Sequence, residues 1–299
     1  MKVSVIVTVL NESNSIEALL ESFLKQTKMP DEIIIVDAGS KDKTVEKIKK
    51  FKNTHKLPIR LFIKPKINRS TARNFAIKKA NQEIIAVTDA GCILGSHWLE
   101  RITAPLIEDK ADSVAGYYVP ITPTAFQKAL APFVAVMPEN FDPEEYLPSS
   151  RSVAFTKRAW ELAGHYPVKL NYCEDLVFAM HLKKNTRMHV EKTAIVYWNQ
   201  KTSYIEFFRQ ITNYARGDIE AGYQPHVIKI ASVYLRYLAF MIYPPFFFCY
   251  LVWAIYKHRK VVQDKACFIY LPALQVTSDI AILWGSFLGL SSKKILQFR

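Results

Sequence analysis

The stretch Val3-Ser4-Val5-Ile6-Val7-Thr8-Val9-Leu10-Asn11-Glu12 decides the fold class of this chain. Its first seven residues are mostly β-branched and apolar, which is typical of a strand buried on both faces of a parallel sheet. The run is too short for the core of a signal peptide with its cleavage site, so we expect this domain to stay in the cytoplasm. The strand ends in two polar residues, Asn11 and Glu12.

Strands and helices alternate after this first strand. Further strands are expected at residues 32–37, 59–63, 83–88, 113–119 and 193–197. Amphipathic helices are expected at residues 14–26, 43–51, 70–80, 156–163 and 174–185, with Ser70 as the cap of the third. Such alternation predicts βαβ units, and therefore an α/β fold with a mixed, mostly parallel sheet and helices on both faces.

The composition changes at about residue 228. Residues 237–256 carry no formal charge and would span about 30 Å as one helix, enough to cross a bilayer. A second apolar run covers residues 266–290. Pro244-Pro245 interrupts the first run and Asp279 the second. We therefore expect a domain at 1–220 and an apolar, membrane-associated helical region at 221–299.

The charge distribution indicates what the C-terminal region meets. The chain has a formal net charge of +13, and residues 221–299 carry nine Lys or Arg against two acids, or +7. Basic residues beside apolar runs favour an anionic membrane surface over nucleic acid. If both runs spanned, the basic linker 257–265 would lie opposite the N-terminal domain. A re-entrant hairpin bent at Pro244-Pro245 would keep it cytoplasmic, and a soluble apolar helical subdomain is a third possibility.

Polar residues follow three of the expected strands. The first ends in Asn11-Glu12, the second in Asp37 and the fourth in Asp89-Ala90-Gly91. Ligands of open α/β sheets bind at the carboxyl ends of strands, so these residues would face one cleft. Carboxylates there could accept hydrogen bonds from ribose hydroxyls and a base imide, while Mg²⁺ could bridge to a diphosphate. Additional positive charge could come from Arg69, Arg73 and Arg151.

These segments together resemble the family 2 glycosyltransferases of GT-A fold. The matching segments are residues 5–12, 36–44, 72–74 (Ala-Arg-Asn), 89–91 and 174–175 (Glu-Asp), in the family's order over roughly residues 1–220. The resemblance implies a GT-A (Rossmann-like) fold and an inverting transferase. Its donor would be a nucleotide-diphosphate sugar, and its acceptor a hydroxyl of a glycan or a lipid-linked acceptor at the cytoplasmic membrane face.

The resemblance also implies a role for each matching residue. Asp37 would hold the nucleoside, and Asn11 and Glu12 would line its pocket. Asp89 would meet the ribose and a metal ion, and Asp175, next to Glu174, would be the catalytic base. Arg73 and Arg151 are further candidates for contact with the donor. Asp89, Gly91 and the other donor-binding residues would form one site.

Two departures from the family pattern bear on the function. Gly91 stands where the family has a second aspartate, so a divalent cation (Mg²⁺ or Mn²⁺) would either rest on Asp89, the diphosphate and water or bind weakly. Asn213 and Tyr214 stand where membrane-bound polysaccharide synthases carry Arg and Trp, which weakens the case for a processive synthase. Residues 203–222 can equally be a plain amphipathic linker helix.

Two other functions remain open from the sequence. A polyprenyl-phosphate sugar synthase would transfer the sugar to a phosphate, which needs little help from a base. A non-catalytic membrane scaffold would keep the fold without the reaction, and the glycine at position 91 is its main support.

Overall fold

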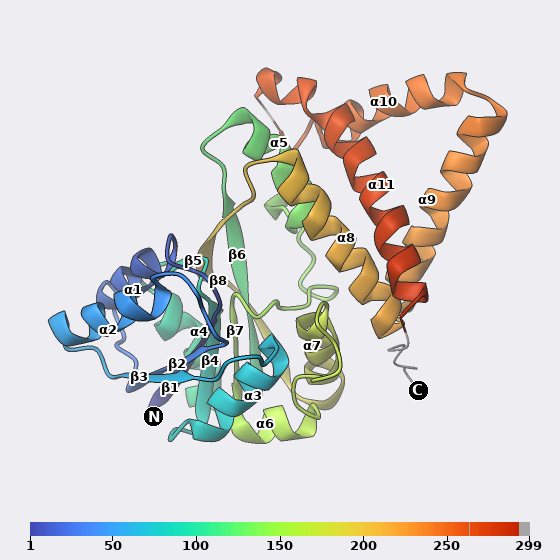
Figure 1. The fold of residues 1–299 in the computed structure, drawn as a ribbon. Helices are drawn as coiled ribbons and strands as arrows, with labels where there is room; N and C mark the ends of the chain where they lie inside the picture. The colour runs from blue at the N-terminus through green and yellow to red at the C-terminus, as the bar shows by residue number, and fades with distance from the viewer. Residues whose placement is uncertain (263, 293–299) are drawn as a thin grey trace. The chain divides into compact units, whose positions relative to one another are not determined.

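The computed structural model describes residues 1–262 and 264–292 (Figure 1). The chain divides into two compact units, one formed by residues 1–119 and 142–199, the other by residues 120–141 and those from 200 onward. The expected boundary at residue 220 falls at the end of a helix, α8 (Tyr204–Ala221), that belongs to the second unit. Helix α8 packs along the last helix of the same unit.

The first unit is built on an eight-stranded sheet in the order β3-β2-β1-β4-β7-β6-β8-β5. The strands are β1 (Val3–Val9), β2 (Glu32–Asp37), β3 (Ile59–Ile63), β4 (Ile84–Asp89), β5 (Cys92–Leu94), β6 (Ser113–Ile121), β7 (Val153–Thr156) and β8 (Met188–Asn199). The first four pair in parallel, whereas β7 is antiparallel to β4 and β6, and β5 is antiparallel to β8. The mixed α/β fold expected from the sequence is confirmed.

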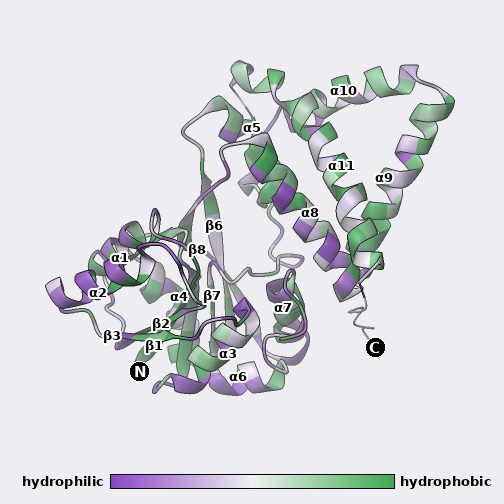
Figure 2. Ribbon diagram, viewed as in Figure 1, coloured by the Kyte–Doolittle hydropathy of each residue, from purple (hydrophilic) through white to green (hydrophobic). Residues whose placement is uncertain are grey.

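Helices cover both faces of this sheet. They are α1 (Ile16–Leu24), α2 (Thr44–Thr54), α3 (Arg69–Lys79), α4 (Trp98–Ile107), α6 (Lys157–Leu162) and α7 (Glu174–Asn185). Ile6 and Ile34 share one core cluster with side chains of α3, α6 and α7. Val5 and Ile33, the residues before Ile6 and Ile34, point to the opposite face of the sheet and are also fully buried. That face is therefore covered too, and α4 contacts β4, β7 and β8. The central strands accordingly appear green in Figure 2.

One helix start differs from the sequence prediction. Asn68, and not Ser70, caps α3, because its Oδ1 accepts the backbone N–H of Thr71. The Asn68 amide also donates to the carbonyl of Val168 at 2.7 Å, which ties the start of α3 to the loop before α7. Ser70 lies one residue inside the helix and is fully buried.

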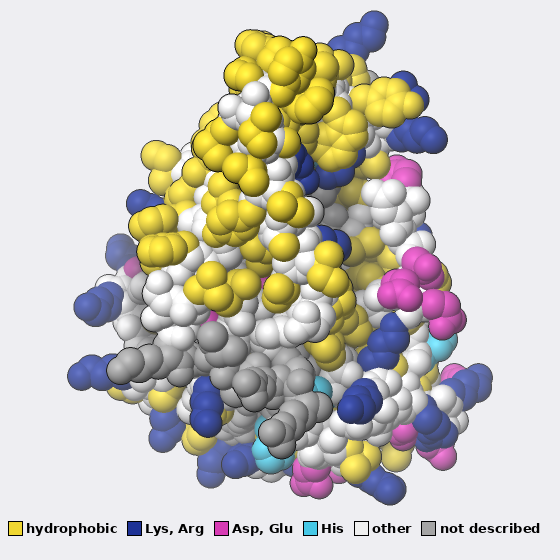
Figure 3. Space-filling model, turned by 90° about the vertical axis from the view of Figure 1, so that its right-hand side faces the viewer, with side chains coloured by type: hydrophobic (Ala, Val, Ile, Leu, Met, Phe, Trp, Pro, Cys, Tyr) yellow, Lys and Arg dark blue, Asp and Glu magenta, His cyan; other side chains and the backbone are white. Residues whose placement is uncertain are grey.

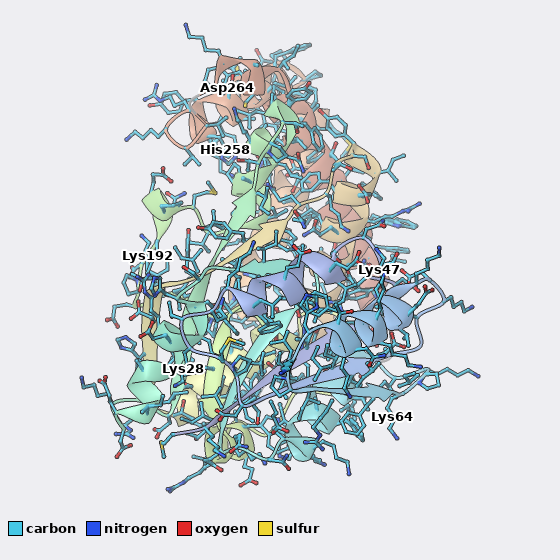
Figure 4. The ribbon with its side chains drawn as sticks, turned by 90° about the vertical axis from the view of Figure 1, so that its left-hand side faces the viewer. Lys28, Lys47, Lys64, Lys192, His258 and Asp264 are labelled. Atoms are coloured by element: carbon cyan, nitrogen blue, oxygen red, sulfur yellow. The ribbon has the colours of Figure 1, made fainter. Side chains whose placement is uncertain are left out.

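The second unit is helical. It contains α5 (Ala125–Val134), the 3₁₀ turns η1 (Pro138–Asn140) and η2 (Lys265–Ile269), α8, α9 (Gln224–Ile242), α10 (Pro245–His258) and α11 (Leu271–Leu290). A Cβ on Gly285 would lie 2.2 Å from the carbonyl oxygen of Thr212, and one on Gly289 would lie 2.8 Å from Ile219 Cβ. Two glycines one helical turn apart therefore let α11 approach α8 closely. Asp264, labelled in Figure 4, pairs with Lys128 of α5 at 3.0 Å.

The two apolar runs behave differently in this unit. The run at 237–256 is broken at Pro244 into α9 and α10, and the 14 residues of α10 would span only about 21 Å. Of the residues that the structure describes, only α11 forms a helix long and apolar enough to cross a membrane. Asp279, in the middle of α11, is buried and hydrogen bonded within the unit.

The amino edge of the parallel strands is held by the buried carboxylate of Glu32. Ser4 Oγ donates to it at 2.6 Å, Arg60 Nη1 at 2.6 Å and the Asn81 amide at 3.0 Å. Burial acts to raise the pKa of Glu32, but the hydrogen bonds from Ser4, Asn81 and Arg60 outweigh it, so its pKa lies below the ordinary value. The ionised carboxylate thus joins β1, β2 and β3.

We expect Glu32→Gln to lower the free energy of unfolding by about 1–3 kcal/mol at pH 7, because a charged acceptor of several donors is lost. A group whose pKa is depressed on folding contributes stability above its unfolded pKa and loses it as pH falls through the folded value. The difference from the unmodified protein should therefore stay constant from pH 7 to about 5 and shrink at lower pH.

Urea unfolding at several pH values measures this difference. Glu46→Gln, which changes an exposed acid on α2, is the matched control and should leave stability within about 0.5 kcal/mol. A Glu32 variant as stable as this control would contradict the structural role given to the carboxylate.

Candidate functional site

The carboxyl ends of the parallel strands bring the two expected aspartates to one edge of the sheet. Asp37 ends β2 and pairs in register with Val9, while Asp89 ends β4 and pairs with Thr8 of the same strand β1. The two aspartates thus flank β1, two strand spacings or about 10 Å apart in the sheet. This register follows from the buried apolar pattern of β1, β2 and β4, which fixes the strands relative to one another.

A buried arginine connects this edge to α7. Arg73 of α3 is only 2% exposed, and its Nη2 lies 2.9 Å from Asp89 Oδ1 while its Nη1 lies 2.9 Å from Glu174 Oε1. Its guanidinium also lies over the ring of Tyr166, 5.3 Å from the centroid. One cation therefore joins the consecutive elements α3 and β4 to α7, which comes much later in the sequence, and it places the Glu174-Asp175 pair beside Asp89.

The charge states of this cluster follow from burial and from the arginines. Burial acts to raise the pKa of Asp89, but the charges of Arg73, Arg151 and Arg69 outweigh it, so its pKa lies below the ordinary value. Burial and the neighbouring Asp175 raise the pKa of Glu174, and Arg73 and Arg69 offset part of that effect. Asp89 is thus an ionised carboxylate, and 34% of its side-chain surface is exposed.

Asp175 lies in the first turn of α7, which begins at Glu174 as the sequence predicts. Its side chain is half-buried, and its Oδ1 accepts the backbone N–H of Leu176 at 3.0 Å. The neighbouring Glu174 accepts a hydrogen bond from Arg73. Asp175 lies at the N-terminus of the helix, where the helix dipole stabilises negative charge. Of the two acids, Asp175 is therefore the more accessible one.

Asp37 holds the loop that follows its strand and keeps one oxygen unused. Its Oδ1 accepts the backbone N–H groups of Gly39 and Ser40, both at 2.9 Å. Its Oδ2 is buried and has no hydrogen-bond partner among the described residues. Gly39 has φ = +106°, a conformation that L side chains rarely adopt, so this tight turn requires a glycine.

Asn11 and Glu12 tie the first two strand ends together. The N–H of Asn11 donates to Ser40 Oγ at 2.8 Å, and Asn11 Oδ1 accepts the N–H of Lys41 at 2.9 Å. The N–H of Glu12 donates to Thr44 Oγ1 at 2.8 Å. The expected position of both residues at this edge agrees with the structure, although much of their hydrogen-bonding capacity serves the loops themselves.

The two arginines expected to contact the donor, Arg73 and Arg151, have different surroundings. Arg73 was expected to meet the donor, but its guanidinium is enclosed and occupied by two carboxylates. Arg151 lies over the rings of Trp198 and Tyr118, at 4.2 and 4.9 Å, and its charge acts on Asp89. Arg69, at the start of α3, is 64% exposed and lies 3.8 Å from Glu174, so it is the more accessible cation.

The residues around Asp89 determine what a cation could bind. A Cβ on Gly91 would meet nothing within 4 Å, so open space lies where a second carboxylate could have stood. Cys92 offers no alternative, because burial raises the pKa of its thiol to about 12. Among residues 1–262 and 264–292, no three His, Cys, Asp or Glu side chains form a metal-binding group. Asp89 fits Mg²⁺ or Mn²⁺ only as a single ligand that shares the ion with phosphate oxygens and water.

Two residues of the site carry no recognisable signal in the sequence. Tyr166 is buried beneath Arg73 and its hydroxyl lies 3.1 Å from Ser150 Oγ, while Trp198 supports Arg151 from the end of β8. Single aromatic residues are common in cores, so their place beside the site depends on tertiary packing alone.

Comparison with known proteins identifies the sequence family. Residues 4–157 match the model of the family described as glycosyl transferase family 2. Glycosyltransferase AglE from Haloferax volcanii is 32% identical over 117 residues, 38% of this chain and 38% of that protein. Poly(ribitol-phosphate) beta-N-acetylglucosaminyltransferase TarS from Staphylococcus aureus is 26% identical over 186 residues, 60% of this chain and 32% of that protein. The matches thus span about a third of the length of these relatives.

Solved structures agree with this fold. Mannosyltransferase PcManGT from Pyrobaculum calidifontis, in complex with GDP-Man and Mn²⁺, has a TM-score of 0.61 at 17% identity, over 95% of this chain and 87% of that one. S. aureus TarS 1-349 in complex with UDP-GlcNAc has a TM-score of 0.54 at 23% identity, over 72% and 66%. The family model matches more than half of the residues of this chain, so this chain belongs to glycosyltransferase family 2.

Proposed function

We propose that this enzyme transfers a sugar from a nucleotide-diphosphate sugar to a hydroxyl of a glycan or lipid-linked acceptor, with inversion at the anomeric carbon. The observation that carries the proposal is the Arg73 bridge, because it places Asp89 and the N-terminus of α7 at the same edge of the sheet. A donor held at Asp89 would then have Asp175 close to its sugar. This arrangement supports a single displacement by an acceptor hydroxyl.

Asp37 and Asp89 would bind the nucleotide half of the donor. The unused Oδ2 of Asp37 is an acceptor for a base or ribose donor group, and a charge-assisted hydrogen bond of this kind contributes about 1.5–3 kcal/mol. Asp89 would meet the ribose and, together with the diphosphate, hold a divalent cation. That cation would neutralise charge on the departing diphosphate. Arg69 and Arg151 would add positive charge around the same leaving group.

Asp175 would act as the general base. Its carboxylate would take the proton of the acceptor hydroxyl as the oxygen attacks the anomeric carbon from the face opposite the diphosphate. Glu174 and Arg73 would position it by fixing the start of α7 against α3 and β4. A correctly placed base contributes about 10²–10⁴-fold to such a step.

The location that fits this chain is the cytoplasmic face of a membrane, with the sheet domain in the cytoplasm. The apolar helix α11, the exposed apolar side chains of α9 and α10, and the excess of Lys and Arg after residue 220 support this location. A lipid-linked acceptor would be available there.

We expect a UDP- or GDP-linked sugar to stabilise the protein against heat, and to do so more strongly with Mg²⁺ or Mn²⁺. The solved neighbours bind UDP-GlcNAc and GDP-Man, which makes these donors the first to test. At about 100 times its Kd, a donor adds roughly 2.7 kcal/mol to stability. Thermal unfolding with UDP-, GDP- and dTDP-sugars, with and without each cation, measures the effect.

Asp37→Asn is the matched test of the nucleotide site. It keeps the oxygen that holds the 39–40 turn and replaces the unused acceptor with an amide donor, so donor binding should weaken about 10–100-fold. Asp109→Asn, at a 90% exposed position, should bind the donor normally. No stabilisation by any donor, with or without cation, would contradict the proposed activity and favour a non-catalytic scaffold.

We expect Asp175→Asn to reduce sugar transfer about 10²–10⁴-fold while donor binding stays nearly unchanged, because only proton removal from the acceptor is lost. Sugar transfer from whichever donor stabilises the protein, measured in parallel with donor-induced thermal stabilisation, separates the two effects. If the variant still transferred sugar at the original rate, the acceptor would be a phosphate, as in a polyprenyl-phosphate sugar synthase. Loss of donor binding as well would contradict the role of Asp175 as base.

A further inference from the structure

A surface cavity of about 440 Å³ lies within the second unit, between α9 and α10. Its wall is apolar and aromatic, and its one formally charged lining residue is Arg236. The main lining side chains are those of Arg236, Ala239, Phe240, Phe246, Tyr250 and Trp253. An apolar cavity with one cation suits a molecule that carries an apolar chain and an anionic group.

Arg236 is held in place by a buried carboxylate. Its Nη1 donates to the Tyr250 hydroxyl at 2.6 Å and lies 3.4 Å from Asp279 Oδ1. Asp279 is 1% exposed, so it can orient Arg236 but is not itself open to solvent. The side chain of Arg236 keeps 28% of its surface exposed. The cation is therefore preorganised at the cavity, with part of its surface available to an anion.

Positive charge exceeds negative charge around this cavity. Lys257 lies over the ring of Trp253, a lining residue, at 5.1 Å from its centroid. The charges of Arg236 and Lys229 both act on Lys257, and Asp279 is the carboxylate that acts against them. Arg236 at the cavity and Lys257 over Trp253, against the buried carboxylate of Asp279, leave a local excess that a phosphate group would neutralise.

The surface around the cavity is apolar over a wide area. The large exposed side chains of α9 and α10 include Leu235, Leu238, Met241, Ile242, Phe246, Phe248, Val252 and Trp253. Figure 3 shows hydrophobic side chains gathered over one face, with Lys and Arg side chains at its border. Exposed apolar surface of this extent marks an interaction site. Trp, Tyr, Lys and Arg beside it are the residues that anchor proteins at a lipid interface.

We propose that the cavity between α9 and α10 binds the head of an anionic phospholipid, with Arg236 and Lys257 contacting the phosphate and the aromatic wall covering the start of the lipid chains. The inference rests on the membrane location in the proposed function, but not on the donor or the sugar. The charge excess favours an anionic lipid over a second copy of this chain, whose same surface would carry the same positive charge.

Vesicle flotation with the full chain tests the site, using phosphatidylcholine vesicles with and without phosphatidylglycerol. The protein should bind the anionic vesicles more tightly. Ala239→Phe fills the cavity without a change of charge and should remove most of this preference. Lys257→Gln should weaken binding to anionic vesicles about fivefold, the effect of one cation near such a surface. Lys260→Gln is the matched control, because Lys260 is an exposed lysine three residues further on, whereas Lys257 lies over the lining residue Trp253; this variant should bind nearly as tightly as the unmodified protein.

Folding of each variant is checked by circular dichroism and by donor-induced thermal stabilisation, which should be unchanged. Equal losses in Lys257→Gln and Lys260→Gln would indicate diffuse charge attraction and overturn the site, as would an Ala239→Phe variant that keeps its preference. Displacement of the protein from anionic vesicles by inorganic phosphate at the same concentration as the phosphatidylglycerol would indicate a free-phosphate site and overturn the lipid assignment. Stable self-association that vesicles do not disrupt would do the same.

The outcomes also separate this inference from the proposed function. Anionic vesicle binding without any donor stabilisation would leave the lipid site standing and remove the transferase proposal. Donor stabilisation without preference for anionic vesicles would do the reverse.

Discussion

The two ion pairs of Arg73 hold the candidate active site together. A guanidinium that is 2% exposed is costly to bury, and it is stable there because Asp89 and Glu174 each lie 2.9 Å from it. Burial alone would lower the pKa of Arg73, but these carboxylates raise it well above its ordinary value, so the cation stays charged. Asp89 belongs to the parallel sheet and Glu174 to a helix 85 residues later. Without the cation between them, the two carboxylates would repel each other.

In this arrangement, Glu174 differs from the nearby Asp175 and Asp89 in burial and in pairing. Glu174 is 3% exposed and paired, so it is part of the framework, whereas Asp175 and Asp89 keep surface that a ligand can reach. The same division occurs at Asp37, where one oxygen holds the turn at residues 39–40 and the other lacks a partner among the described residues. Each of these acids is thus fixed by contacts within the protein.

The second unit relies on the same principle with different residues. Asp279 lies in the middle of an apolar helix, where a lone carboxylate would be costly, and Tyr250, Gln275 and Arg236 satisfy it. Gly285 and Gly289 allow α11 to pack closely on α8. Helix α11 is therefore shaped to pack within its unit as well as apolar enough for a bilayer, while α9 and α10 carry the exposed apolar surface.

The sequence by itself determined the family and most elements of the sheet domain, although β5, β7 and α4 were not predicted from it. The strands β1, β2 and β4 are buried on both faces, so their sequences are continuous apolar runs that are easily recognised. Parallel strands have their carboxyl ends at the same edge of the sheet, so the acids that follow these runs could be predicted to lie there. The break at Pro244 was equally readable, because proline cannot continue a helix. Only the tertiary structure decided that Arg73 bridges Asp89 and Glu174, that the Asn68 amide donates to the carbonyl of Val168, and that α8 packs on α11. These contacts join residues distant in sequence, and no local pattern of polarity records which partner a buried charge or a glycine will meet.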